Sequence, residues 1–174
     1  KSFIVGTKVG WPNEFDANQG LLSSKSIFWH VDQSLVKLNT DYIDILWLHK
    51  WDEETPIIET LNAISILIKQ GKIRYLGISN FNTWQTSLIV TTARIKYDIS
   101  IIAVQSEYNL LKRDTYLDLK DCIDYLDLNF IPYFPLASGF LTGKYSNNHI
   151  PSNSRGEWAT YMKNMLNKKH YQFL

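Results

Sequence analysis

The sequence predicts an α/β protein: a partial (β/α)8 TIM barrel, in which about five parallel strands alternate with helices. Three features predict this fold. Short apolar runs recur along the 174 residues, segments with helical periodicity separate them, and a polar residue follows each run. Such alternation implies right-handed crossovers and a parallel sheet. A complete barrel needs about 250 residues, so we expect residues 1–174 to form a single incomplete barrel domain.

The predicted strands are apolar runs without interruption, which is typical of strands buried on both faces. They cover residues 3–7, 43–48, 73–78, 101–104 and 130–133. The alternative fold is an open doubly wound sheet. No Gly-x-Gly-x-x-Gly turn follows the first run, so a Rossmann-type nucleotide site is not predicted.

The first two helices are predicted from their caps and their apolar faces. After a loop at residues 10–20, Ser24 is a candidate N-cap. The apolar positions that follow share one helical face: Ile27, Val31, Leu35 and Leu38. In the next helix Thr55 is the expected cap, Pro56 the first helical residue and Gly71 the end. Its buried stripe is Leu61, Ile64 and Ile68.

Three further helices are expected towards the C-terminus. Asn82 and Gln85 have the spacing of a capping box, which predicts a helix start there. Residues 115–126 are predicted to be helical, with Leu119, Cys122, Ile123 and Leu126 inward. A last helix is expected at about residues 156–169, with one apolar side: Trp158, Met162 and Met165.

Composition argues against several classes of function. The formal net charge is +1, which disfavours a dedicated nucleic-acid binder. Asp44 and His49 interrupt the most apolar region, so no membrane span is predicted. A single cysteine, Cys122, fits a reducing compartment, and we expect a cytoplasmic protein. No metal site is expected, because three histidines lack ligand spacing: His30, His149 and His170. The oligomeric state stays open.

A polar or aromatic residue stands at the end of each predicted strand. These residues are Lys8, His49, Ser79 with Asn80, Gln105 and Tyr133. Each of them alone is more often structural than functional. In a parallel barrel, however, all strand ends of this kind lie around one mouth. The joint pattern therefore favours a functional site over independent structural roles. A barrel hydrolase or isomerase is disfavoured, because it would need a nucleophile or paired carboxylates there.

Several segments resemble the aldo-keto reductase family, in family order and spacing. They are GTKVG, LVKLNTDYIDILWLHKWD, TPIIETLNAISILIKQGKIRYLGISNF, VQSEYNLL and YFPLASGFLTGKY. The details resemble the aryl-alcohol-dehydrogenase-like branch. The resemblance implies an NADPH-dependent oxidoreductase that reduces small-molecule aldehydes or ketones to alcohols. The alternative within the family is a non-catalytic regulatory subunit that binds a nicotinamide cofactor.

By this resemblance Lys8 is the catalytic lysine and His49 the catalytic histidine. A carbonyl that receives hydride develops negative charge on oxygen, and a tyrosine with a free pKa near about 10 needs help to protonate it at neutral pH. A nearby ammonium favours the phenolate and thus lowers that pKa. A neutral imidazole can hydrogen-bond the carbonyl and orient it.

The resemblance also implies a binding site for NADP(H). Ser79, Asn80 and Gln105 match residues that hold the nicotinamide carboxamide, which both donates and accepts hydrogen bonds. Tyr133 matches the aromatic residue that stacks on the nicotinamide ring. The positions beside the pyrophosphate are Phe134, Leu136 and Ser138, with Phe134 in place of a usual serine.

The family's acid tyrosine and its partner aspartate precede the lysine by a few tens of residues, whereas only seven residues precede Lys8 here. We therefore expect a fragment without measurable turnover of its own. Asp127 and Asn129 stand where the family usually has glycine, and both residue types tolerate left-handed backbone.

Overall fold

The computed structural model of the protein describes residues 3–12, 21–146 and 149–166. The chain divides into two compact units. The first comprises Lys1–Ser106 and Leu117–Ile131, and the second Glu107–Tyr116 and Pro132–Leu174. The prediction of a single domain stays a prediction, and each unit is described by itself below.

The sheet consists of five strands in the order of the sequence, β1-β2-β3-β4-β5. Their bounds are β1 (Gly6–Val9), β2 (Ile43–Leu48), β3 (Ile73–Ser79), β4 (Ile101–Glu107) and β5 (Asn129–Tyr133). The pairs from β1 to β4 are parallel, as predicted. Several boundaries were predicted wrongly. The first strand runs from Gly6 to Val9 instead of residues 3–7, with Phe3 and Ile4 exposed, and the fourth continues past Val104 to Glu107. The end of the third strand and the start of the fifth each differ by one residue.

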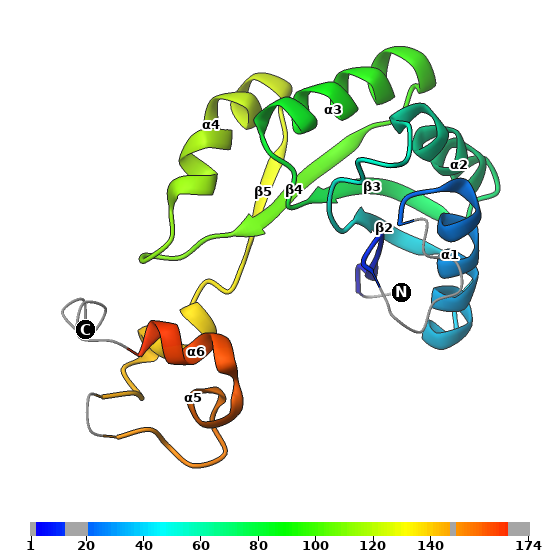
Figure 1. The fold of residues 1–174 in the computed structure, drawn as a ribbon. Coiled ribbons are helices and arrows are strands. Elements are labelled where there is room, and N and C mark those ends of the chain that lie inside the picture. The colour runs from blue at the N-terminus through cyan, green and yellow to red at the C-terminus, as the bar shows by residue number, and fades with distance from the viewer. Residues whose placement is uncertain (1–2, 13–20, 147–148, 167–174) are drawn as a thin grey trace. The chain divides into compact units, whose positions relative to one another are not determined.

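The helices of the first unit all cover one face of the sheet (Figure 1). They are α1 (Ser24–Leu38), α2 (Ile57–Lys69), α3 (Thr83–Tyr97) and α4 (Asp114–Leu126). A doubly wound fold has helices on both faces and a strand order that reverses at a switch point. The sequential order and the single helical layer therefore confirm a partial (β/α)8 barrel and exclude the open alternative.

The helix ends follow local hydrogen-bonding rules, with two corrections. The N-cap of α1 is Ser23, whose hydroxyl accepts from the Ser26 N–H at 3.3 Å, and Ser24 is already helical. The N-cap of α2 is Pro56 instead of Thr55, without a side-chain cap. The capping box of α3 is confirmed: Asn82 and Gln85 exchange hydrogen bonds of 2.9 and 3.0 Å.

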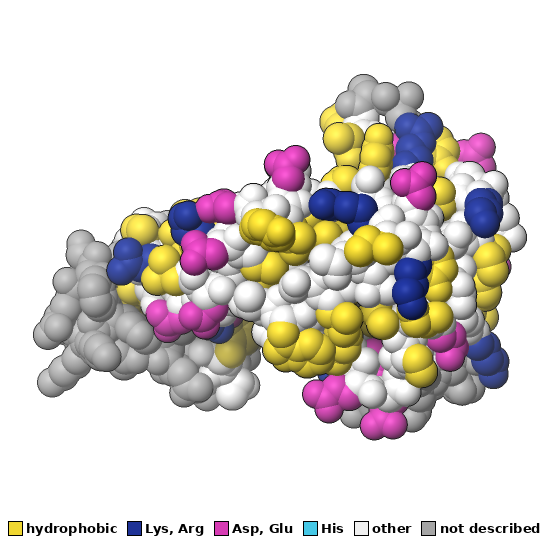
Figure 2. Space-filling model, turned by 90° about the horizontal axis from the view of Figure 1, so that it is seen from above, with side chains coloured by type: hydrophobic (Ala, Val, Ile, Leu, Met, Phe, Trp, Pro, Cys, Tyr) yellow, Lys and Arg dark blue, Asp and Glu magenta, His cyan; other side chains and the backbone are white. Residues whose placement is uncertain are grey.

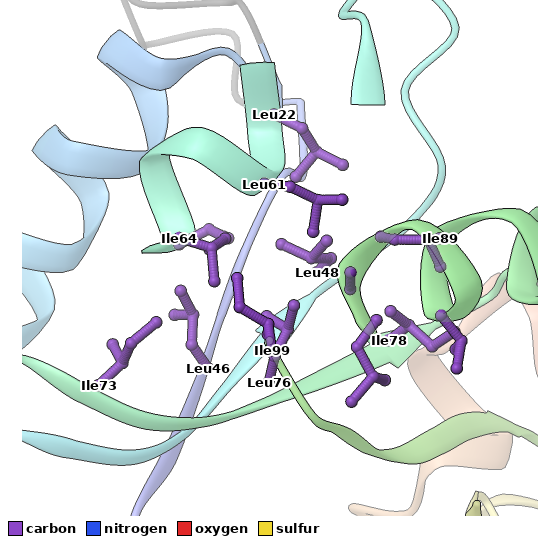
Figure 3. Close-up of a cluster of buried hydrophobic side chains, with 14 of the residues drawn as sticks. Leu22, Leu46, Leu48, Leu61, Ile64, Ile73, Leu76, Ile78, Ile89 and Ile99 are labelled. Carbon is purple, nitrogen blue, oxygen red and sulfur yellow. The ribbon is translucent and has the colours of Figure 1, made fainter. Parts of the chain in front are cut away.

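The hydrophobic core of the first unit lies between the sheet and its helices (Figure 3). Leu46, Leu48, Leu76 and Ile78 extend from β2 and β3 towards α2 and α3, where they meet Leu61, Ile64 and Ile89. All are fully buried. The predicted faces of α1 and α4 are buried as well, except that Leu38 is exposed and Cys122 only partly covered.

The opposite face of the sheet holds a close contact between two strands. Lys8, Trp47 and Gly77 are register partners on β1, β2 and β3. A Cβ atom placed on Gly77 would lie 2.4 Å from Cε3 of the Trp47 indole, so the ring lies directly on the glycine. Trp47 is 6% exposed as a result. Glycine is required here by the approach of the indole.

The second unit contains a short 3-10 segment, η1 (Ala137–Thr142), and two short helices, α5 (Arg155–Trp158) and α6 (Thr160–Met165). The single helix predicted for residues 156–169 was wrong, because Ala159 leaves the helical region with ψ at 113°. Met162 is buried with Phe140 and Tyr145, whereas Trp158 is exposed. The remainder of the predicted helix, residues 167–169, lies outside the described residues.

Within the described ranges, no helix is long and apolar enough to cross a membrane. The same ranges contain no group of three or more His, Cys, Asp or Glu side chains arranged to hold a metal ion.

Candidate active site

Lys8 and His49 lie at the C-terminal ends of the adjacent strands β1 and β2. Lys8 is the register partner of Trp47, and side chains two residues apart share a face, so Lys8 and His49 project from the same side. The Lys8 Nζ lies 5.5 Å from the centre of the Trp47 ring. The His49 N–H donates to the Val9 carbonyl at 2.8 Å, which extends the strand pairing to the end of the site.

The electrostatics of this pair favour a neutral imidazole. Burial lowers the pKa of His49, and the positive charge of Lys8 lowers it further. Burial also lowers the pKa of Lys8 from its usual range. Both shifts share one cause, since a partly desolvated site penalises each cation, and repulsion from Lys8 adds to the shift of His49. At neutral pH His49 is therefore an uncharged group that can hydrogen-bond a carbonyl oxygen.

Ser79, Asn80 and Gln105 lie on the neighbouring strand ends of β3 and β4. Ser79 and Gln105 are register partners, and the Asn80 N–H donates to the Gln105 carbonyl at 3.0 Å. The Asn80 side-chain amide donates to the His49 carbonyl at 2.9 Å and to the Ser79 hydroxyl at 3.1 Å. Asn80 is exposed with φ at 57°, a left-handed conformation that asparagine tolerates. These bonds join the ends of three strands.

Ser79 differs from the other predicted cofactor residues because it is 0% exposed. Its hydroxyl lies against the Asn80 amide. Ser79 can therefore position the side-chain amide of Asn80 through this hydrogen bond. The exposed Asn80 and the partly exposed Gln105 are the side chains that a ligand can reach.

Asp52 holds the segment that follows His49. Its carboxylate accepts from the Leu22 N–H and from the Glu54 N–H, each at 3.0 Å, and it is 4% exposed. Burial alone would raise the pKa of this carboxyl, but hydrogen bonds from Leu22, Glu54 and Thr55 outweigh it and the pKa is lowered. Asp52 thereby ties the loop after β2 to the residues before α1.

We expect Asp52→Asn to lower the free energy of unfolding by about 2 kcal/mol at neutral pH, because an amide cannot accept both backbone bonds as a carboxylate does. A lowered pKa in the folded state stabilises the fold above the unfolded pKa and is lost as pH falls through the folded value. The difference from wild type should therefore shrink in acid. Urea unfolding at several pH values measures it, and Asp41→Asn on an exposed aspartate is the control.

Of the tryptophans near the strand ends, only Trp11 stays at the surface beside His49. The ring centres of Trp11 and His49 are 4.6 Å apart. Lys50 places its Nζ 5.9 Å from the Trp11 ring. Trp47 is buried against Gly77, and Trp51 packs against Phe81 and the core.

In the second unit the residues after β5 form a turn with left-handed backbone. The positive φ angles belong to Phe134, Ala137, Ser138 and Gly139. Left-handed residues other than glycine are uncommon and concentrate at functional sites. Asn109 supports the turn by donating from its amide to the Phe134 carbonyl at 3.2 Å. Tyr133 precedes it, and burial together with the charge of Glu107 raises its pKa.

This turn lines a pocket of about 630 Å³ within the second unit. Phe134, Leu136 and Ser138 contribute to its wall, as do two cationic side chains, Lys144 and Arg155. The buried Ser154 side chain also lines it, and its hydroxyl is a hydrogen-bond partner of the Tyr145 phenol. Two cationic side chains in one pocket suit an anionic ligand.

Lys144 and Arg155 were not predicted from the sequence. GFLTGKY resembles a phosphate-binding loop too weakly to single out Lys144, and Arg155 follows an Asn- and Ser-rich stretch that is typical of a surface loop. Only the fold of this unit brings the two cations to one pocket.

Tyr145 supports the backbone of one wall of this pocket. Its ring is 2% exposed, and its hydroxyl accepts from the Gly156 N–H at 3.2 Å. A Cβ on Gly156 would lie 2.6 Å from the ring, so the backbone next to Arg155 rests directly on Tyr145. The phenol therefore fixes the segment that carries Ser154 and Arg155.

Tyr145→Phe keeps the ring and removes the hydroxyl, which leaves the Gly156 N–H without its acceptor. We expect a loss of about 1 kcal/mol in stability and a several-fold weaker affinity for an anionic ligand of this pocket, because Arg155 is no longer held. Fluorescence titration measures the affinity, and Tyr125→Phe on the surface of α4 is the matched control. An unchanged affinity would show that Tyr145 serves the core alone.

Each unit, taken by itself, carries side chains that suit one part of a nicotinamide dinucleotide. Asn80 and Gln105 carry amides that donate and accept, as a carboxamide requires. Lys144 and Arg155 suit phosphate groups.

Comparison with known proteins gives consistent results over most of the chain. The model of the aldo/keto reductase family matches residues 1–172. L-glyceraldehyde 3-phosphate reductase of Escherichia coli (strain K12) is 37% identical over 158 residues, which are 87% of this chain and 44% of that protein. Aflatoxin B1 aldehyde reductase member 2 of Rattus norvegicus is 37% identical over 124 residues, 71% of this chain and 34% of that protein.

A third relative has a different kind of name. A probable voltage-gated potassium channel subunit beta of Oryza sativa subsp. japonica is 34% identical over 169 residues, 95% of this chain and 50% of that protein. The chain thus spans about half the length, or less, of these curated relatives.

Proposed function

Because the chain belongs to the aldo/keto reductase family, we propose that it serves the NADPH-dependent reduction of small-molecule aldehydes or ketones to alcohols. The observation that carries this proposal is the gathering of Lys8, His49, Asn80 and Gln105 at the ends of β1 to β4. The reductase names of several relatives at 32–37% identity support it.

The proposed roles follow from the charges and hydrogen bonds of the site. The bound nicotinamide supplies the hydride. Neutral His49 donates a hydrogen bond to the carbonyl oxygen and orients it. Lys8 offers a positive charge near the oxygen that becomes negative, and it favours the ionised form of a proton-donating phenol. The indole of Trp11 beside His49 shields the reacting group from water on one side.

We assign cofactor contacts in each unit by itself. Asn80 and Gln105 hold the carboxamide, with Ser79 fixing Asn80. Tyr133 stacks on the nicotinamide ring. The anionic part of the cofactor binds to the pocket of the second unit, with these residues: Phe134, Leu136, Ser138, Lys144 and Arg155.

The first test is a titration of the chain with NADPH, in which the fluorescence of NADPH reports binding. The second test is an assay of carbonyl-dependent NADPH oxidation in the longest polypeptide that contains the chain. We expect Gln105→Leu to weaken NADPH binding about tenfold, because the nicotinamide carboxamide loses its hydrogen-bond partner. Gln70→Leu, at the exposed end of α2, should not change it. Absence of binding by wild-type protein would refute the proposal.

The second candidate is a regulatory subunit that binds the nicotinamide cofactor without turnover. The similarity to a probable channel beta subunit over 95% of the chain favours it. The presence of both Lys8 and His49 favours the reductase. Tight NADPH binding with no oxidation for any of a panel of aldehydes and ketones would select the regulatory role.

A further inference from the structure

The turn after β5 begins at a residue with an unfavourable backbone conformation. Phe134 has φ at 54°, in the left-handed region. This region is uncommon for a bulky side chain. The residue before a proline, as Phe134 is before Pro135, is moreover normally extended. Such a conformation persists only where neighbouring groups fix it, so the peptide at Phe134 must be held from outside.

Two donors hold the Phe134 carbonyl. The Ala137 N–H closes the turn on it at 2.8 Å, and the side-chain amide of Asn109 donates to it at 3.2 Å. Pro135 stands at the second position of this turn, and Leu136 at the third has φ at −101° and ψ at 19°, which fits a type I turn. The Asn109 amide thus joins the turn to the segment that follows β4.

Asn109 is itself fixed by hydrogen bonds. It is 3% exposed. Its side-chain oxygen accepts from the N–H groups of Leu111 and Lys112, at 3.0 and 3.1 Å. Its backbone N–H and carbonyl exchange hydrogen bonds of 3.1 Å with those of Lys112. The side-chain nitrogen is therefore aimed at the Phe134 carbonyl by contacts that already order this side chain in the absence of a ligand.

The turn presents backbone N–H groups in the wall of the pocket. Leu136 and Ser138 both line the pocket. Their N–H groups have no hydrogen-bond acceptor among the described residues, whereas that of Ala137 between them donates within the turn. Ala137 is left-handed, with φ at 48°, and follows the right-handed Leu136. Successive N–H groups in such a conformation form a concavity that binds anions.

We propose that Asn109 is a positioning residue for the anionic ligand of this pocket. Asn109 does not line the pocket. It acts through the Phe134 carbonyl, which sets the direction of the N–H groups of Leu136 and Ser138. This inference rests on the proposed function, in which the ligand is the pyrophosphate of the cofactor. Without the donated bond, Phe134 can return to extended backbone, and these N–H groups then no longer converge on an anion.

The experiment uses two probes, NADPH and ADP-ribose, which carries a pyrophosphate but no nicotinamide. Asn109→Asp keeps an acceptor for the N–H groups of Leu111 and Lys112, but its carboxylate cannot donate to the Phe134 carbonyl. The dissociation constants of both probes should rise by a similar factor of about tenfold. The effect is partial because the Phe134 ring still stacks on Tyr161, with 6.3 Å between ring centres. Isothermal titration calorimetry measures both constants.

Two control variants separate the position of the turn from charge and from stability. Asn109→Ala adds no charge and should weaken the binding of both probes at least as much as Asn109→Asp does. Asn129→Asp removes the same kind of bond in the first unit, where the Asn129 amide donates to the Ile102 carbonyl at 3.0 Å. It should leave both dissociation constants within about twofold of wild type. Circular dichroism shows whether each variant is folded.

The surface of the molecule bears on the choice of small anionic probes. On the face that Figure 2 shows, the basic side chains are spread among acidic and hydrophobic ones. The described side chains of this face therefore do not form a second site of concentrated positive charge for the probes.

Kinetics supply a readout that a purely structural role would not change. In the longest polypeptide that contains the chain, Asn109→Asp should raise KM for NADPH about tenfold and leave kcat within about twofold, because the bond serves cofactor binding and not the reacting atoms.

Three results would overturn the role of Asn109. The first is an unchanged affinity of Asn109→Asp for ADP-ribose. The second is an affinity that Asn109→Asp weakens and Asn109→Ala does not, which would make the added charge the cause. The third is an equal loss in Asn129→Asp, which would point to general destabilisation.

Failure of the proposed function gives a different pattern. A wild-type chain that binds neither probe would overturn the proposed function and this inference together. A wild-type protein that binds both probes and reduces no carbonyl would overturn the proposed reaction alone, while the affinities of the Asn109 variants still decide the role of this residue.

Discussion

Lys8→Met should lower kcat for carbonyl reduction by about 10²–10⁴-fold, the contribution of a well-placed acid–base group. The variant keeps the length and apolar stem of the side chain, so contact with the Trp47 ring is preserved while the charge is lost. Affinity for NADPH should stay within about twofold, because the proposed cofactor side chains are untouched. Steady-state kinetics on the longest polypeptide that contains this chain measures both.

The same variant has a second readout that does not depend on turnover. Because the charge of Lys8 helps to lower the pKa of His49, Lys8→Met should raise that pKa towards the usual histidine range. An NMR titration, which follows the chemical shifts of the His49 imidazole against pH, measures this pKa. Lys25→Met, on the exposed side of α1, is the matched control and should alter neither kcat nor the His49 titration. Wild-type kcat in the Lys8→Met protein would remove Lys8 from the mechanism.

Gly77→Val should destabilise the protein by about 3 kcal/mol or more, at the upper end for overpacking. Three atoms of the Trp47 indole lie within 2.8 Å of the position a Cβ would take. In an ordinary strand, replacing glycine would stabilise the fold by about 0.5–1 kcal/mol, so the sign itself is diagnostic. Urea unfolding gives the value.

A double-mutant cycle identifies the indole as the cause. In a Trp47→Leu background the clash is removed, and Gly77→Ala should become neutral or stabilising, whereas in wild type it destabilises. Equal destabilisation in both backgrounds would mean that backbone conformation, and not the ring, requires glycine at this position.

The sequence predicted the strand order, the helical layer and the residues at the strand ends well, because these depend on local periodicity and on caps such as Asn82 with Gln85. It failed where the outcome depends on distant contacts. The break at Ala159 occurs within a segment that has helical periodicity, and nothing local marks it. The left-handed Asp127 was expected, whereas Asn129 enters β5 and donates to the Ile102 carbonyl.

The candidate site, too, could be predicted from the sequence only in part. Strand ends converge by topology, so Lys8, His49 and Asn80 could be grouped before any coordinates. The burial of Ser79 and the pocket of Lys144 and Arg155 could not be foreseen, since both depend on how separate segments pack.

The amide of Asn80 has a consequence for how quickly and how tightly a ligand can bind. Its bonds to the His49 carbonyl and the Ser79 hydroxyl fasten one rim of the sheet while no ligand is present. The entropy of ordering that rim is spent during folding and not at the moment of association. The binding site is therefore preorganised at this rim. Variants such as Asn80→Ala should lower the association rate constant of a ligand as well as raise its dissociation rate constant.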